Sequence, residues 1–200
     1  TPPPGVKRRR LTQSRARERE QSLVLQYTDL DAGHQAAASK VISRNADYTK
    51  YTRLRMYVHG DSVASYVIDA DSSDMEVFLR FGIDGANYYE MATPVYPGWD
   101  DRNEMDVDLL IMSQLKARLL ERQLAGVVDS LGATLVWLDS LVIDENRRDG
   151  APALYRVRGR PSMQQIKQLS LGVRNRGLQL REYSGQAWVD ELRLDDARND

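Results

Sequence analysis

The chain has 200 residues, of which 42% are hydrophobic, and its 28 basic and 29 acidic side chains leave a formal net charge of -1. This length suits one domain, or one domain with an arm, and such a chain can bury a core without covalent staples. The absence of cysteine excludes disulfides, thiolate metal sites and cysteine nucleophiles. The balanced charge points to no class of partner, and no segment approaches the ~20 apolar residues of a membrane-spanning helix.

The first 20 residues have the composition of an extended arm or linker. TPPPG favours extended backbone, and Lys7 to Arg19 holds seven basic residues against one Glu. A basic run can mark nucleic-acid binding, but this one has no aromatic side chain for base stacking. We therefore predict a solvated arm over residues 1–20, no nucleic-acid partner, and one folded domain over residues 21–200. The ends TPPPG and DDARND suggest a piece of a longer protein.

Alternation of apolar and polar residues predicts several β-strands that each bury one face. The pattern runs through EQSLVLQYTDL (20–30), RLRMYVHG (53–60), MEVFLRFGID (75–84) and NYYEMATPV (87–95). It resumes in ALYRVRG (153–159), QIKQLSLGVRN (165–175) and QAWVDELRL (186–194). Between the first two strands, the small residues Ala36 to Lys40 are expected to form a short helix.

The middle of the chain has a different period. Leu109, Met112, Leu115 and Leu119 recur at helical spacing, which predicts a helix over about 110–124. ATLVWLDSLVIDEN (133–146) is apolar enough for a buried strand or for an extension of a hairpin, and both interpretations stay open. Many strands, one or two short helices and no regular βαβ alternation favour an antiparallel β-sandwich.

The order of these features resembles a jelly-roll module of the galactose-binding-like, carbohydrate-binding type, whose last strand is similar to Trp188–Leu192. A closer resemblance lies in YTRLRMYVHGD, LRFGIDGANYYEMATPV, SQLKARLLER, YRVRGRPSM, IKQLSLGVRNRG and SGQAWVDELRL. In this order they resemble the SprA/Sov family of very large outer-membrane proteins, which serve the type IX secretion system and gliding motility. Residues 127–149 match no part of it and are interpreted as an insertion.

The resemblance implies a soluble, non-catalytic domain carried by a giant β-barrel through which folded cargo leaves the periplasm. The implied location is the cell envelope, at the outer membrane, on its periplasmic or surface side. The implied partners are other segments of the same barrel protein, a shuttle protein, a plug protein and the cargo. The family supplies no catalytic residue, and the two histidines, His34 and His59, fit no catalytic or zinc motif.

Two ligand sites can be considered from the residues themselves. Aromatic rings beside polar side chains are typical of sugar sites, and the cluster in ANYYEMATPVYPGWDD offers Tyr88, Tyr89, Tyr96 and Trp99. The alternative is that these rings pack inward and brace a loop. Carboxylates in DADSSD suggest a calcium site at Asp69, Asp71 and Asp74. The alternative is that this stretch is an acidic turn exposed to solvent. A carbohydrate-binding module is thus the second functional hypothesis, and a calcium-dependent adhesin domain is the third. We expect no cofactor, with a structural calcium ion left open.

Arginines at alternate positions predict an interaction surface for an acidic partner. The residues are Arg156, Arg158, Arg174 and Arg176. The alternative is a solvated face with cross-strand ion pairs.

Asp190 poses a separate problem, because alternation in SGQAWVDELRLDD places it on the same face as Trp188, Leu192 and Leu194. A carboxylate among core residues must be paired or hydrogen-bonded. We predict that Asp190 is a structural buried carboxylate held by an arginine such as Arg156 or Arg158, or by backbone N–H groups. Calcium ligation is the third option.

Overall fold

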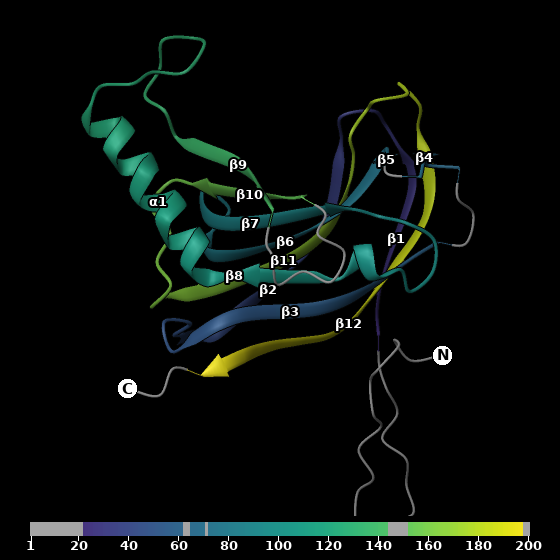
Figure 1. Ribbon diagram of the computed structural model, residues 1–200, viewed down its shortest axis with the longest axis horizontal. Helices are drawn as coiled ribbons and strands as arrows, with labels where there is room; N and C mark the ends of the chain where they lie inside the picture. The colour runs from purple at the N-terminus through teal and green to yellow at the C-terminus, as the bar shows by residue number, and fades with distance from the viewer. Residues whose placement is uncertain (1–21, 62–64, 71, 144–151, 198–200) are drawn as a thin grey trace, which may run out of the picture.

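In the computed structural model, the described residues are 22–61, 65–70, 72–143 and 152–197. They form two antiparallel sheets that pack face to face, with one α-helix along one side (Figure 1). The four-stranded sheet has the order β1 (Leu23–Leu30), β12 (Tyr183–Ala197), β3 (Tyr51–Gly60) and β8 (Met105–Asp108). The six-stranded sheet has the order β2 (Gln35–Ala46), β11 (Ile166–Asn175), β6 (Met75–Asp84), β7 (Asn87–Pro94), β10 (Pro152–Arg158) and β9 (Trp137–Ile143). This is the β-sandwich that the alternating pattern predicts.

Smaller elements complete the architecture. A short hairpin joins β4 (Val67–Asp69) and β5 (Ser72–Ser73), and the 3-10 turn η1 (Asp101–Asn103) precedes β8. The helix α1 (Leu109–Leu124) follows β8 directly and contacts β9, β10 and β3. Among the described residues, no helix is long and apolar enough to cross a bilayer.

The core lies between the sheets and follows the period of two. In β3 the residues Leu54, Met56 and Val58 are buried, and their polar neighbours face outward. Val77, Leu79 and Phe81 of β6 join the same core. One continuous cluster of apolar side chains therefore holds both sheets, and the other face of each sheet is left to carry function.

The predicted helix is confirmed, and its first turn shows why it begins where it does. Asp108 is the N-cap, and its carboxylate accepts hydrogen bonds from Leu110 N at 2.8 Å and Ile111 N at 3.1 Å. Leu109, Met112, Leu115 and Leu119 form the buried face. The helix closes the sandwich on the side of β9 and β10 (Figure 1).

Two segments, residues 36–40 and part of residues 133–146, form β-strands of the six-stranded sheet. Residues 36–40 are not a helix but part of the strand β2, because pairing with β11 outweighs the helical preference of alanine. Within residues 133–146, which the sequence left open, Trp137–Ile143 forms the outer strand β9. The predicted arm, residues 1–20, lies outside the described residues.

Candidate functional site

Glu90 occupies the centre of the outer face of the six-stranded sheet. Its side chain is 0% exposed although it points away from the core, because arginines cover it from the adjacent strands β6 and β10 and from β11, the next strand beyond β6. It accepts hydrogen bonds from Arg80 Nε, from Arg174 Nη2 at 2.8 Å and from Arg156 Nη1 at 3.4 Å. Arg156 also reaches Asp139 on β9, with Nη2 to Oδ2 at 3.2 Å. One carboxylate thus joins three arginines across four strands.

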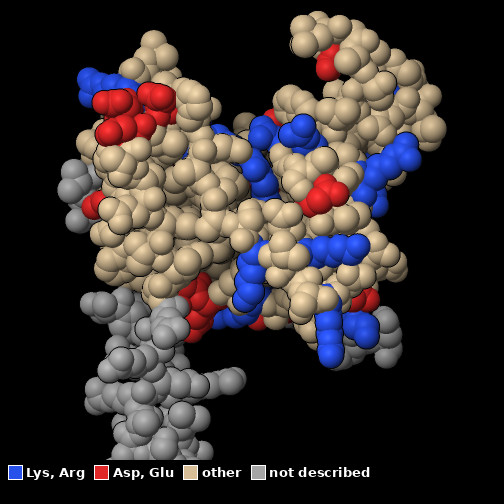
Figure 2. All heavy atoms as spheres, turned by 180° about the vertical axis from the view of Figure 1, so that it is seen from behind, with Lys and Arg blue, Asp and Glu red and all other residues tan. Residues whose placement is uncertain are grey.

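Phe78 and Glu76 extend this layer along β6. Phe78 is fully buried on the outer face, because the guanidinium carbons of Arg80 and Arg174 lie 4.3 and 4.9 Å from its ring centroid. Arg174 also pairs with Glu76. Burial alone would lower the pKa of Arg174, but the carboxylates of Glu90 and Glu76 outweigh burial and raise that pKa. Figure 2 shows Lys and Arg side chains gathered over the middle of this side of the molecule.

A hollow of about 190 Å³ opens beside this network on the same face. Its walls include Arg80 and Tyr88, and its rim on β2 is formed by the small residues Ala37 and Ser39. Ser39 Oγ and Ser170 Oγ share a hydrogen bond of 2.7 Å there. Asp84 also lines the hollow, and its carboxylate accepts hydrogen bonds from Ala86 N and Asn87 N of its own turn. The hollow therefore offers a guanidinium group, hydroxyl groups and an aromatic wall, beside a carboxylate that is already hydrogen-bonded.

The outer face of the four-stranded sheet carries a second ion-pair network. Asp106 of β8 is buried and accepts from Arg53 Nε at 2.5 Å and from Arg55 Nε at 3.0 Å. Arg55 Nη1 also lies 3.4 Å from Asp195 of β12, which pairs in turn with Arg193. These pairs connect three of the four strands.

An aromatic row lies next to this second network. The ring centroids of His59 and Trp188 are 4.9 Å apart in a stacked arrangement, and those of His59 and Trp99 are also 4.9 Å apart, in an edge-on arrangement. Burial between these rings lowers the pKa of His59, although the nearby Asp61 carboxylate acts in the opposite direction. Burial therefore favours the neutral imidazole.

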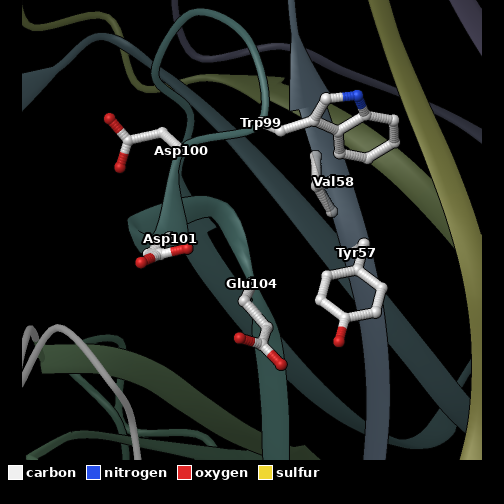
Figure 3. Close-up of a pocket in the computed structure, with 6 residues that line it drawn as sticks. All are labelled: Tyr57, Val58, Trp99, Asp100, Asp101 and Glu104. Carbon is white, nitrogen blue, oxygen red and sulfur yellow. The ribbon is translucent and has the colours of Figure 1, made fainter. Parts of the chain in front are cut away.

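A small recess separates these rings from a group of carboxylates. Figure 3 shows Tyr57 and Trp99 on one side of the recess, and Asp100, Asp101 and Glu104 on the other. Its volume is about 10 Å³, which is barely enough for one water molecule. Asp100 also holds Arg102 through two hydrogen bonds, of 2.9 and 2.7 Å, and this pairing lowers the pKa of Asp100. The recess is thus too small for a sugar ring.

The structure separates the four aromatic residues proposed for sugar binding. Tyr89 lies in the core, where burial raises its pKa to about 12, and Tyr96 is buried under Arg102. Tyr88 lies under Arg80 on the six-stranded face, whereas Trp99 lies over the four-stranded sheet. The prediction of a sugar site stays untested, but these residues do not converge on one surface.

The four arginines proposed as a partner surface also differ from one another. Arg156 and Arg174 belong to the Glu90 network, as the alternative interpretation of cross-strand pairs expects. Arg176 Nη1 donates to Ser73 O at 3.0 Å, and Arg158 is exposed at the end of β10. Most of these arginines are therefore bound within the protein and are not available to pair with an acidic partner.

The residues proposed for calcium binding do not form one group of carboxylates among the described residues. Asp74 is fully buried, and its carboxylate accepts from Leu178 N at 2.6 Å, Gln179 N at 3.0 Å and Tyr183 Oη at 3.0 Å. Asp69 is exposed, and Asp71 lies outside the described residues. Within the described part of the chain, no three His, Cys, Asp or Glu side chains are grouped to hold a metal ion.

Asp190 is not on the core face, so the predicted burial is wrong. Ala187 and Val189 point inward, and Asp190 lies half-buried on the outer face, opposite Tyr57 of β3. Its carboxylate accepts from Glu191 N at 2.9 Å and from Ser22 Oγ at 3.4 Å. Arg156 and Arg158 belong to the other sheet and are not its partners. The reason is a β-bulge: Glu191, with φ of 49°, and Leu192 together oppose the single residue Met56.

Sequence reasoning missed Glu90, which is the buried carboxylate that arginines hold. A signal for it existed, because Glu90 sits between the core residues Tyr89 and Met91 and must therefore face outward with Arg80 and Arg156. That signal required the order of strands β6, β7 and β10, which one sequence alone does not supply.

The comparisons with known proteins agree with the resemblance seen in the sequence. No curated protein matches the chain. The SprA_N family, described as motility related/secretion protein, matches residues 2–200. Because this match covers nearly the whole chain, the chain belongs to the SprA_N family of motility-related and secretion proteins.

Proposed function

We propose that this chain is a non-catalytic module of a large outer-membrane secretion translocon, which serves type IX secretion and gliding motility. The observation that carries the proposal is the family match along residues 2–200. The module would lie in the cell envelope, on the periplasmic or surface side. It would act as a structural or docking element for other segments of the barrel protein, for the shuttle and plug proteins, and for cargo.

The construction of the two outer faces supports a docking role more than a catalytic one. The buried carboxylates Glu90 and Asp106 are each held by arginines. Groups fixed in this way present a rigid polar surface, which suits recognition of another protein. The dispersal of Tyr88, Tyr89, Tyr96 and Trp99 gives the carbohydrate-binding alternative less support.

Fractionation of native cells tests the proposal. An antibody raised against this domain should detect a very large protein in the outer-membrane fraction. A band of modest size in the medium or in a soluble fraction would contradict the translocon role. In that case a panel of polysaccharides, tested against the chain at millimolar concentration, becomes the next experiment.

A further inference from the structure

β2 forms one edge of the six-stranded sheet. It is 12 residues long and pairs with β11 on one side, and no strand of the described chain pairs with its other side. Most of its side chains are exposed on both faces, and Val41 is 76% exposed. A long edge with unpaired backbone groups and exposed apolar residues is a site at which another strand can add.

The register identifies the amides that face outward from this edge. Gly33 N donates to Asn175 O at 3.0 Å and Asn175 N donates to His34 O at 2.9 Å, so Gly33 and His34 form a bulge opposite Asn175. Beyond this bulge, His34 and Asn175 set the phase of the hydrogen-bonded pairs. Such pairs alternate with non-bonded pairs along an antiparallel ladder. The register is continuous from the pair Gln35–Arg174 to the pair Val41–Gln168. Alternate N–H groups of β2 therefore point away from β11, to solvent. These belong to Gln35, Ala37, Ser39 and Val41.

Charge selects the kind of strand that fits. β2 carries Lys40 and Arg44 and no acidic residue. A second copy fits poorly, because antiparallel self-pairing centred on β2 brings the like charges of the two copies close together. An extended segment with acidic side chains has the complementary charge.

The hollow beside β2 supplies a place for one such side chain. Ala37 and Ser39 form its rim on the edge strand, so a side chain from an added strand can pass over them toward Arg80. Arg80 is held in position by Glu90 and by Gln35 Oε1, which accepts from Nη2 at 2.9 Å. A preformed guanidinium group is a suitable partner for a carboxylate.

We propose that β2 accepts an extended acidic segment of a partner protein as a seventh strand, with one carboxylate side chain entering the hollow toward Arg80. The inference rests on the docking role proposed above and names the chemistry of the partner. Main-chain hydrogen bonds to the outward amides provide affinity, and the hollow with Lys40 and Arg44 provides selectivity.

Fluorescence polarisation of labelled peptides tests this proposal on the 200-residue chain. The probe is a short peptide with blocked ends in which pairs of Val alternate with pairs of Glu, so that carboxylates lie on both faces of the extended peptide. Its matched control has Lys in place of Glu. The acidic peptide should bind about ten-fold tighter, since two cationic side chains, Lys40 and Arg44, lie along the edge strand. The double variant Lys40→Glu/Arg44→Glu should reverse this order. Equal binding of both peptides would refute the proposal.

N-methylation of the peptide separates strand addition from general charge attraction. Two acidic peptides are N-methylated at alternate residues, one on each edge of the strand. The peptide that loses its β2-facing N–H groups should bind about ten-fold more weakly, and the other should bind as the parent does. Equal affinities of the two methylated peptides would show that no strand is added.

A matched pair of protein variants tests the hollow. Ala37→Leu fills the rim, whereas Ala36→Leu adds the same side chain on the opposite face of β2. Only the first should weaken binding of the acidic peptide, by a few-fold. Equal effects of the two variants would show that the hollow does not take part in binding. If the chain dimerises and Ser39→Pro abolishes the dimer, the occupant of the β2 edge is a second copy and not an acidic partner. Failure of peptide binding leaves the fractionation result unchanged, so the two proposals fail separately.

Discussion

The outer faces of the two sheets use arginine–carboxylate pairs in different ways. On the six-stranded face, Glu90 is shared by Arg80, Arg156 and Arg174, and it is completely covered by them. On the four-stranded face, Asp106 holds two arginines, and each of these has a further carboxylate near it. Arg156 and Arg174 also pair with Asp139 and Glu76, but the second partner of Arg80 is the uncharged side chain of Gln35. The six-stranded face therefore gathers three arginines on one buried acceptor, whereas each arginine beside Asp106 has a second carboxylate.

The number of ion pairs on a face does not measure how much the stability of that face depends on them. Exposed ion pairs contribute little, because water screens both charges in the folded chain and ordering two long side chains costs entropy. A buried acceptor is different, because its loss leaves buried charges without a partner. The six-stranded face should therefore be the more fragile of the two, and the following changes test this expectation in order of decreasing effect.

Glu90→Ala should have the largest effect. It removes the common acceptor of three part-buried arginines and leaves Arg80 with the uncharged amide oxygen of Gln35 in place of a carboxylate. We expect a loss of about 3–5 kcal/mol in the free energy of unfolding. Urea denaturation followed by circular dichroism measures the change. Glu121→Ala, at an exposed position of α1, is the matched control and should change little. A loss below about 1 kcal/mol at Glu90 would show that the arginines find other partners.

Asp106→Ala should destabilise the chain less, by about 1–3 kcal/mol. Arg53 keeps Asp108 at 3.7 Å and Arg55 keeps Asp195 at 3.4 Å, so neither guanidinium is stranded. The same denaturation measurement applies. If Asp106→Ala costs more than Glu90→Ala, the distinction between the two faces is wrong.

Asp190→Ala should cost less than about 1 kcal/mol, because the carboxylate is half-buried on the outer face. Its bonds are to the next residue in the chain and to Ser22. The melting temperatures of Asp190→Ala and Asp74→Ala are compared. Asp74→Ala should lower the melting temperature more, since Asp74 is buried and accepts three hydrogen bonds. Equal shifts in melting temperature would restore a core role for Asp190.

The pH dependence of the aromatic row should be the smallest effect. Burial lowers the pKa of His59 in the folded chain, so the unfolded state binds the proton first as pH falls. The contribution of neutral His59 is therefore present above its ordinary pKa of about 6.5 and decreases below it. Urea midpoints at several pH values should show this slope in the parent and a shallower slope in His59→Gln. Identical slopes would mean that His59 is not responsible.

Much of the fold could be predicted from period and composition alone. Leu54, Met56 and Val58 alternate in β3, and Leu109 to Leu119 recur at helical spacing, so both elements were recognised. The error at residues 36–40 arose because alanine favours helices locally, while the pairing of β2 with β11 is a long-range effect.

The candidate sites were harder to predict, because they depend on which strands are neighbours. The pairing of Arg80, Arg156 and Arg174 with Glu90 spans β6, β7, β10 and β11, and nothing in one strand shows it. The misplacement of Asp190 has a more local cause, since strict alternation cannot register a bulge. Charge and spacing could suggest that arginines line a sheet face, but not that they would cover a carboxylate.

The bulge in β12 has a consequence for how one strand serves two purposes. Before it, the odd-numbered residues face the core; after it, the even-numbered Leu194 does, opposite Leu54. The extra residue therefore acts as a change of phase within a continuous strand. It lets β12 present Trp188 at one end and the charged pair of Arg193 and Asp195 at the other, all on the outer face. If the same residues paired without the bulge, strict alternation would turn the final third of the strand inside out, directing Arg193 into the core and Leu194 toward water. Deletion of the extra residue would instead keep Arg193 opposite Arg55 and Leu194 opposite Leu54.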